Sequence, residues 1–362
     1  MLTPELFRLM LKSWRASIPR RYRKRTGVPK VDFRFPSQIE RKYAQFLERL
    51  YKAYTQPLLT RIKPILEQAT RKDSLHADAY DPNQLDFLFG DLEKLDTQIF
   101  YDYNDPNVYR GRFSGVEEHV ASFGWDTSTF NTEQWKKLVG VAIPSYMLED
   151  EPWMREAVDN WAKLNATLID GDAGQFYAKA ESIIRSAVQT GRRAEDVMVD
   201  LLSLESKLTR NRAKFIARDQ IGTLTGIMTQ KRSESVGLDL YTWRTAMDER
   251  VRGRPNGKWE YTDYSHWLME GKICKWNDST VYSNDGKTWH HRSELKAVVT
   301  YHAKTFTGTR GKPEKAAGAG KSKVATAPIA IPGAEPNCRC GSRAFLGNLL
   351  EELDAELAEA GL

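Results

Sequence analysis

Residues 215–252 read FIARDQIGTLTGIMTQKRSESVGLDLYTWRTAMDERVR, and the spacing of apolar residues changes within this stretch. Before Gly237 the apolar residues recur at the spacing of one helix face. Gly237 follows the last of them, at a position where glycine commonly ends a helix. The next segment, LDLYTWRTAM at 238–247, is short and rich in aromatic and β-branched residues, which favours a strand. The stretch therefore predicts a helical region that gives way to a β-containing region near residue 238.

The rest of the chain extends this division in both directions. Upstream, the apolar spacing is helical over residues 37–54 and over much of 151–236. Downstream, LKAVVTYHAKTF at 295–306 and CRCGSRAFL at 338–346 predict two further strands. We therefore predict an α+β fold that is predominantly helical, with a helical N-terminal and middle region followed by a small β-containing C-terminal domain.

The length of 362 residues allows two to three domains at the usual size of about 150 residues each. Changes in composition predict where the segments begin and end. We expect a basic N-terminal arm (1–36), an N-terminal helical region (37–150), a helical segment (151–237), a compact α+β region (238–345) with a flexible Gly/Ala/Lys-rich loop at 307–330, and an acidic C-terminal helix (346–362).

The overall composition excludes several classes of protein. Hydrophobic residues make up 41% of the chain, which is enough for a packed core. No run of about 18 apolar residues occurs, so the sequence predicts no membrane-spanning helix. The N-terminus also lacks the apolar centre and cleavage site of a signal peptide. The chain has three cysteines, which argues against a disulfide framework and indicates a reducing compartment.

The N-terminal arm concentrates positive charge. Nine basic residues and one acid lie between Lys12 and Arg34, with aromatic residues among them. This mixture suits contact with phosphates combined with stacking on bases, and it equally suits docking on an acidic protein surface. If the partner is DNA, we expect the contacts from the densest part of the arm: Arg20, Arg21, Arg23, Lys24 and Arg25.

Two of the three cysteines lie one residue apart in PGAEPNCRC, residues 332–340. In a strand, Cys338 and Cys340 would point to the same face with Cα atoms about 6.6 Å apart, at the upper edge of disulfide geometry. Two interpretations remain open. The thiols could bind zinc with His266, with Cys274 as a possible fourth ligand, or they could simply pack as small side chains beneath a loop. We expect no cofactor, with zinc as the alternative.

A second group of residues allows either chemistry or structure. Asp248, Arg250 and His266 could act as base, anion clamp and acid in a nuclease-like site. Alternatively, Asp248 could accept hydrogen bonds in a turn while the arginines bridge neighbouring elements. The sequence contains no phosphate-binding glycine loop, nucleophile elbow or His-Glu-x-x-His motif.

These segments follow one another in an order that resembles the phage Mu F-like minor head proteins, also called phage head morphogenesis proteins. The resemblance covers about residues 150–345 and is carried by Ala217-Arg-Asp-Gln220, Gly237, Tyr241-Thr-Trp-Arg-Thr245, Asp248-Glu-Arg-Val-Arg252, His266-Trp-Leu-Met-Glu-Gly271 and Pro332-Gly333 through Cys340. Its motif positions, to which it gives a structural role, are Asp219, Gln220, Trp243, Thr245, Asp248, Arg250, Arg252, Gly271, Pro332, Gly333 and Arg339.

The resemblance implies a non-enzymatic minor capsid protein of a tailed bacteriophage. Such a protein is associated with the portal vertex and acts in procapsid assembly, DNA packaging or DNA delivery. The implied partners are the portal protein, the major capsid protein or scaffold, and phage DNA, with no membrane partner. The implied location is the virion, after assembly in the host cytoplasm. The alternative function is a nucleic-acid-processing enzyme that uses Asp248, Arg250 and His266.

Overall fold

The computed structural model of the protein describes residues 2–23, 33–71, 114–139, 143, 145–148, 151–190, 192–300, 306–307, 313–314, 322–336 and 338–362. The chain divides into two compact units. The sheet unit comprises Met1–Pro36, Thr127–Met154 and Ile221–Leu362. The helical unit comprises Ser37–Asp126 and Arg155–Gln220.

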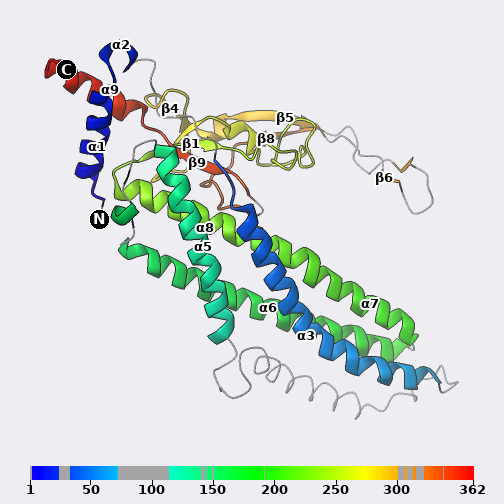
Figure 1. Ribbon diagram of the computed structural model, residues 1–362. Coiled ribbons are helices and arrows are strands. Elements are labelled where there is room, and N and C mark those ends of the chain that lie inside the picture. Colours follow the sequence, from blue (N-terminus) through cyan, green and yellow to red (C-terminus); the bar gives the residue numbers. More distant parts are fainter. Residues whose placement is uncertain are drawn as a thin grey trace. The chain divides into compact units, whose positions relative to one another are not determined.

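Three long helices contribute residues to both units: α5 (Ser114–Val139), α6 (Pro152–Thr190) and α8 (Ala213–Ser235). The helical unit also contains α3 (Ser37–Arg71), α7 (Ala194–Ser206) and the π-helical turn η3 (Lys207–Arg212). Helices α3 and α7 lie side by side within this unit (Figure 1). No helix of the described residues combines the length and the apolar character that crossing a membrane requires.

The core of the helical unit is an aromatic stripe with polar side chains built into it. Tyr43 and Tyr51 are both buried on α3, eight residues apart and therefore on the same side of the helix. Because a buried hydroxyl needs a partner, each tyrosine donates a hydrogen bond to α6: Tyr43 to Asn165 at 3.0 Å, and Tyr51 to Asp172 at 2.9 Å. These bonds fix the register of the two helices against each other.

The sheet unit contains a five-stranded antiparallel sheet with strand order β4-β3-β2-β1-β9. Its strands are β1 (Leu240–Arg244), β2 (Ile273–Lys275), β3 (Val281–Ser283), β4 (Trp289–His291) and β9 (Gly341–Ala344). Separate two-stranded pairs are β5 (Lys296–Thr300) with β8 (Ser322–Thr326) and β6 (Phe306–Thr307) with β7 (Pro313–Glu314). Short 3₁₀ turns are η2 (Ser145–Leu148), η4 (Trp267–Met269) and η5 (Arg292–Glu294).

The change from helix to strand occurs where the sequence predicts it. Gly237 has a φ of +75°, a conformation that glycine adopts at low cost. The amides of Gly237 and Leu238 donate to the carbonyls of Glu234 and Ser233, which caps the last turn of α8. Strand β1 then begins at Leu240 and lies between β2 and β9. The predicted α+β, predominantly helical fold with a small sheet domain toward the C-terminus is therefore confirmed.

Two predicted segments differ from the structure. The region 307–330, expected to be a flexible loop, contains β8, which pairs with β5 along its full length. Its backbone hydrogen bonds are therefore satisfied by a partner strand, which composition alone does not reveal. The third predicted strand, 338–346, is shorter than expected, because β9 begins at Gly341. Both cysteines of PGAEPNCRC consequently lie in the loop that precedes the strand.

The terminal segments of the sheet unit pack against each other. Helix α1 (Pro4–Ser17) lies beside α9 (Gly347–Glu359), and both bury apolar residues in one cluster that includes Phe7, Leu11 and Leu353 (Figure 1). A short helix, α2 (Arg20–Arg23), follows α1. The oppositely charged ends of the chain are thus joined within one compact unit.

Candidate metal centre

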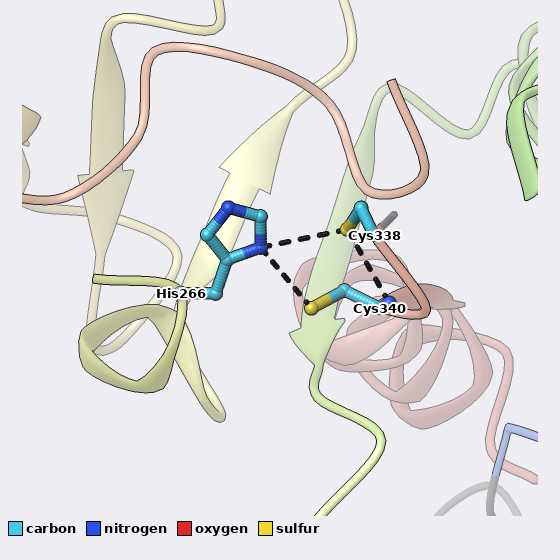
Figure 2. Close-up of side chains that lie close together, drawn as sticks. All are labelled: His266, Cys338 and Cys340. Atoms are coloured by element: carbon cyan, nitrogen blue, oxygen red, sulfur yellow. Dashed lines mark hydrogen bonds between the residues drawn. The ribbon is translucent and has the colours of Figure 1, made fainter. Parts of the chain in front are cut away.

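The structure brings His266, Cys338 and Cys340 together at a buried point in the sheet unit (Figure 2). The imidazole Nδ1 lies 3.4 Å from Sγ of Cys338 and 3.5 Å from Sγ of Cys340. The three ligand-type atoms lie within 4.8 Å of one another. All three side chains are buried, and both cysteines are free thiols. Of the metal ligands predicted from the sequence, these three therefore converge on one point.

Cys274, the possible fourth ligand, does not belong to this group. It lies on β2 opposite Tyr241 of β1, and its thiol is directed to the carbonyl of Lys272 at 3.8 Å. Burial raises the pKa of the Cys274 thiol, which keeps it protonated. Cys274 is therefore a small buried side chain of the sheet.

The cysteines reach His266 from a loop rather than from a strand. The loop turns at Pro332-Gly333, and the amide of Cys338 donates to the carbonyl of Glu335 at 2.9 Å. The amide of Cys340 lies 3.4 Å from Sγ of Cys338 and donates to it. An N–H···S bond of this kind favours the thiolate form of the acceptor. The expectation that strand alternation aligns the two thiols was therefore wrong, although the thiols do converge.

Glu335 and Arg252 fix the orientation of the histidine. Nε2 of His266 lies 2.7 Å from a carboxylate oxygen of Glu335, and the same oxygen accepts a hydrogen bond from Arg252 at 2.7 Å. Arg252 also donates to the carbonyl of Pro336 at 2.6 Å. Because an ionised carboxylate only accepts hydrogen bonds, Nε2 must carry a proton. Nδ1 is therefore the ring nitrogen that faces the two sulfur atoms.

The surroundings of the cluster shift the pKa values of the two thiols in opposite directions. The hydrogen bond with Cys340, opposed by burial and aided by His266, holds the pKa of Cys338 well below its usual value. The hydrogen bond with Cys338 and burial raise the pKa of Cys340 well above its usual value. Burial lowers the pKa of His266, but bonds to Cys338 and Glu335 outweigh it and raise that pKa to about 9. The hydrogen bond from His266 lowers the pKa of Glu335 against the effect of burial.

Trp243 of β1 forms one wall of the cluster. Its indole ring meets the imidazole of His266 edge to face, with ring centroids 5.8 Å apart and an interplanar angle of 85°. Trp243 is fully buried in the same apolar cluster as both cysteines. Its indole N–H interacts with the Cys340 thiol and favours the thiolate form of that group.

Asp248 and Arg250, predicted as possible catalytic residues with His266, contact each other, and Asp248 also contacts Arg339. The carboxylate of Asp248 accepts a hydrogen bond from Arg339 at 2.7 Å and from the amide of Arg250 at 2.9 Å. Among the described residues, Asp248 and His266 share no hydrogen bond or ion pair. Asp248 therefore closes a turn and holds Arg339, as the structural interpretation expects.

The Pro332-Gly333 turn approaches helix α8 closely. A Cβ atom on Gly226 would lie 2.6 Å from the carbonyl oxygen of Pro332, and one on Gly333 would lie 2.6 Å from the carbonyl of Gly222. Gly333 also has a φ of +88°. The hydroxyl of Thr223 donates to the carbonyl of Gly333 at 3.2 Å. The loop that carries the cysteines thus packs on α8 at two glycines, Gly222 and Gly226, where a side chain would collide with it.

The other motif residues of the sheet unit also have structural contacts. Glu270 accepts hydrogen bonds from the amide and the hydroxyl of Thr245, at 2.6 and 2.8 Å. Gly271 has a φ of +75°, and its amide donates to the carbonyl of Trp243 at 2.9 Å. In the helical unit, the side-chain amide of Gln220 donates to Asp219 at 3.1 Å.

The sequence does not single out the two acids that organise this region, Glu335 and Glu270. Glu335 lies within PGAEPNCRC (332–340), and Glu270 lies within the motif His266-Trp-Leu-Met-Glu-Gly271. The feature that could have identified them is that each acid lies a few residues from a predicted metal ligand, Glu335 before Cys338 and Glu270 after His266. Their partners, Arg252, His266 and Thr245, are 25 or more residues away along the chain, so no local pattern could pair them.

The predicted DNA-contacting residues have different environments. Arg20 and Arg21 are exposed on α2, and the guanidinium of Arg21 lies over the ring of Tyr22 at 4.8 Å. Arg23 is buried and donates to the carbonyls of Ile18 and Leu362, at 2.9 and 3.0 Å. Arg23 is therefore removed from the predicted set, because its donors are occupied inside the unit. The two remaining members of the set, Lys24 and Arg25, lie outside the described residues.

Comparison with known proteins finds a partial relative. The chain is 34% identical over 117 residues to a protein of Haemophilus influenzae (strain ATCC 51907 / DSM 11121 / KW20 / Rd) that is described as an uncharacterized protein. The match covers 32% of this chain and 26% of the relative, so the chain spans about a quarter of the relative's length. No family model and no solved structure matches the chain.

Proposed function

We propose that the protein is a structural minor head protein of a tailed bacteriophage, associated with the portal vertex. The observation that carries this proposal is that the motif residues make structural contacts with one another. Asp248 contacts Arg339, Arg252 contacts Glu335, and His266 contacts the two cysteines. Residues that could have formed an enzyme site instead hold the loop of residues 332–340 against the segment between β1 and η4.

This arrangement supports a role in assembly because it makes a rigid platform. A loop with two close backbone approaches to a helix and three side-chain anchors loses little further entropy when a partner binds. The ordered motif set resembles that of the Mu F-like family, and the geometry supplies a physical reason for its residue types. We propose the portal protein and the capsid or scaffold as partners, and phage DNA as the partner of the N-terminal segment.

The test uses the full chain and the portal protein of the phage genome that encodes it. We expect tagged protein to co-purify with portal oligomers and antibody to label proheads at a single vertex. Asp248→Ala, which removes the carboxylate that Arg339 binds, should weaken capture by the portal, whereas Glu249→Ala on the adjacent exposed position should not. Proheads that assemble normally without the protein and never contain it would overturn the proposal.

A further inference from the structure

The separations in the His266 cluster match those expected around one central ion. Zinc binds sulfur at about 2.3 Å and imidazole nitrogen at about 2.0–2.1 Å, so a tetrahedral ion places N and S ligands about 3.6 Å apart. The observed separations of Nδ1 from the two Sγ atoms are 3.4 and 3.5 Å. An imidazole nitrogen has a single in-plane lone pair or proton, and here it is directed to two sulfur atoms at nearly equal distance (Figure 2).

The surroundings also match those of a metal ligand. A metal-bound histidine almost always donates its other ring N–H to a carboxylate or carbonyl, which fixes the tautomer. Glu335 has this position on Nε2, and Arg252 in turn holds Glu335. The buried amide of Cys340 directed at Sγ of Cys338 adds a donor to a thiolate. Two thiolates and one imidazole are a nitrogen and sulfur set that suits zinc.

We infer that His266, Cys338 and Cys340 bind one zinc ion through Nδ1 and the two thiolates, and that Glu335 and Arg252 are positioning residues of this site. The inference is independent of the proposed role in phage heads. Its consequence is structural, because the site joins the segment before η4 to the loop before β9, 72 and 74 residues away along the chain. Binding should therefore stabilise the folded sheet unit.

The first experiment measures metal in the full chain, purified in reducing buffer from cells grown with zinc. Elemental analysis should give about one zinc per chain for the wild type and for Cys274→Ala, which changes a buried cysteine outside the cluster. Cys338→Ser and Cys340→Ser should contain almost none. Less than about 0.1 zinc per chain in the wild type, with none taken up on titration with Zn²⁺, would overturn the inference.

The second experiment remains decisive if the serine variants do not fold. Chelator-treated wild type and Cys274→Ala are titrated with Co²⁺, whose thiolate charge-transfer absorption reports bound sulfur. Both proteins should show the band at equal intensity and saturate at about one equivalent. A band missing from both, or a band that Cys274→Ala removes, would contradict the assignment. A disulfide between Cys338 and Cys340 in the intact mass would also contradict it.

The positioning residues are tested by zinc affinity in competition with a chelating dye. Glu335→Ala should weaken zinc binding about 10–100-fold, and Glu335→Gln should recover part of that loss because its amide oxygen still accepts from Nε2. Arg252→Ala should weaken binding, whereas Arg250→Ala, an exposed arginine of the same turn, should not. Unchanged affinity in Glu335→Ala would show that Glu335 has only a packing role.

Discussion

Asp354 and Arg15 form a bidentate ion pair between the C-terminal helix α9 and the N-terminal helix α1. The carboxylate accepts from Nε and from a terminal nitrogen of the guanidinium, each at 2.8 Å. Arg15 also donates to the carbonyl of Arg23 at 2.7 Å and is 4% exposed. The pair therefore connects α1 with α9 at the edge of their shared apolar cluster.

The first prediction concerns the stability that this pair provides. Asp354→Ala removes a bidentate carboxylate from a nearly buried guanidinium, so we expect a loss of about 1–3 kcal/mol in the free energy of unfolding. The control is Glu352→Ala, whose carboxylate is exposed and pairs with a half-exposed Arg8 at 3.3 Å. That change should cost less than about 1 kcal/mol in urea unfolding. Equal losses for the two variants would contradict the special role of Asp354.

The second prediction is the pH dependence of the α1–α9 contact. The hydrogen bond from Arg15 lowers the pKa of Asp354, and hydrogen bonds from Lys12 and Arg8 lower the pKa of Glu356. A group whose folded pKa is depressed contributes its full stability above its unfolded pKa, about 4, and loses it as the pH falls through the folded pKa. The difference in unfolding free energy between wild type and Asp354→Asn/Glu356→Gln should therefore be constant at neutral pH and shrink toward zero below about pH 4. A difference that persists at about pH 2 would show that the pairing is not electrostatic.

The third prediction separates two glycines that both lie within helices. Gly226→Ala on α8 places a Cβ 2.6 Å from the carbonyl oxygen of Pro332, so we expect a net loss of roughly 1–3 kcal/mol despite the better helix propensity of alanine. Gly174 on α6 is exposed and has no atom within 4 Å of its added Cβ. Gly174→Ala should therefore stabilise by about 0.5–1 kcal/mol. Chemical unfolding checks both signs, and a stabilising Gly226→Ala would show that the loop does not sit on α8.

The fourth prediction concerns a buried ion pair in the sheet unit. Arg232 is 1% exposed and donates three hydrogen bonds to the carboxylate of Glu151, at 2.9, 3.0 and 3.1 Å, as well as one to Asn131. Burial lowers the pKa of Arg232 and raises that of Glu151, opposing the attraction between them. Removing one partner by Glu151→Ala should cost about 3–5 kcal/mol.

The double variant Glu151→Leu/Arg232→Met tests the cause of that loss. It removes both charges, so it should be much less destabilised than Glu151→Ala alone. Glu234→Ala on the exposed side of α8 is the control and should change the unfolding free energy by less than about 0.5 kcal/mol. If the double variant were as unstable as the single one, packing rather than the unpaired charge would explain the loss.

The fifth prediction tests DNA contact by the N-terminal segment. Arg20 and Arg21 are exposed, whereas Arg8 and Lys12 are paired with acids of α9. Arg20→Ser/Arg21→Ser should weaken binding to duplex DNA and reduce the slope of log affinity against log salt by about 2. Arg8→Ser/Lys12→Ser removes the same charge and should change the slope less. Identical effects of the two double variants would indicate a response to net charge rather than contact by α2.

The sequence by itself determined where helix gives way to strand and which residues could bind a metal. The helical spacing up to Gly237 and the aromatic, β-branched run after it predicted the passage from α8 to β1, because helix and strand propensity act over a few residues. It also placed His266, Cys338 and Cys340 in one candidate set, because few residue types bind metals. It failed at 322–326, where a Lys/Ala/Thr-containing segment forms β8 only because β5 offers a partner.

Tertiary structure alone decided which distant side chains meet. Arg15 and Asp354 are separated by 339 positions along the chain, and Arg252 and Glu335 by 83. A local pattern carries no information about such pairs, because their partners are set by the order of strands and by which helix face the loop can approach. The same topology packed the basic N-terminal segment against the acidic C-terminal helix, and it placed Glu335 beside His266. The sequence identified the residue types, but their roles depended on contacts that only the fold creates.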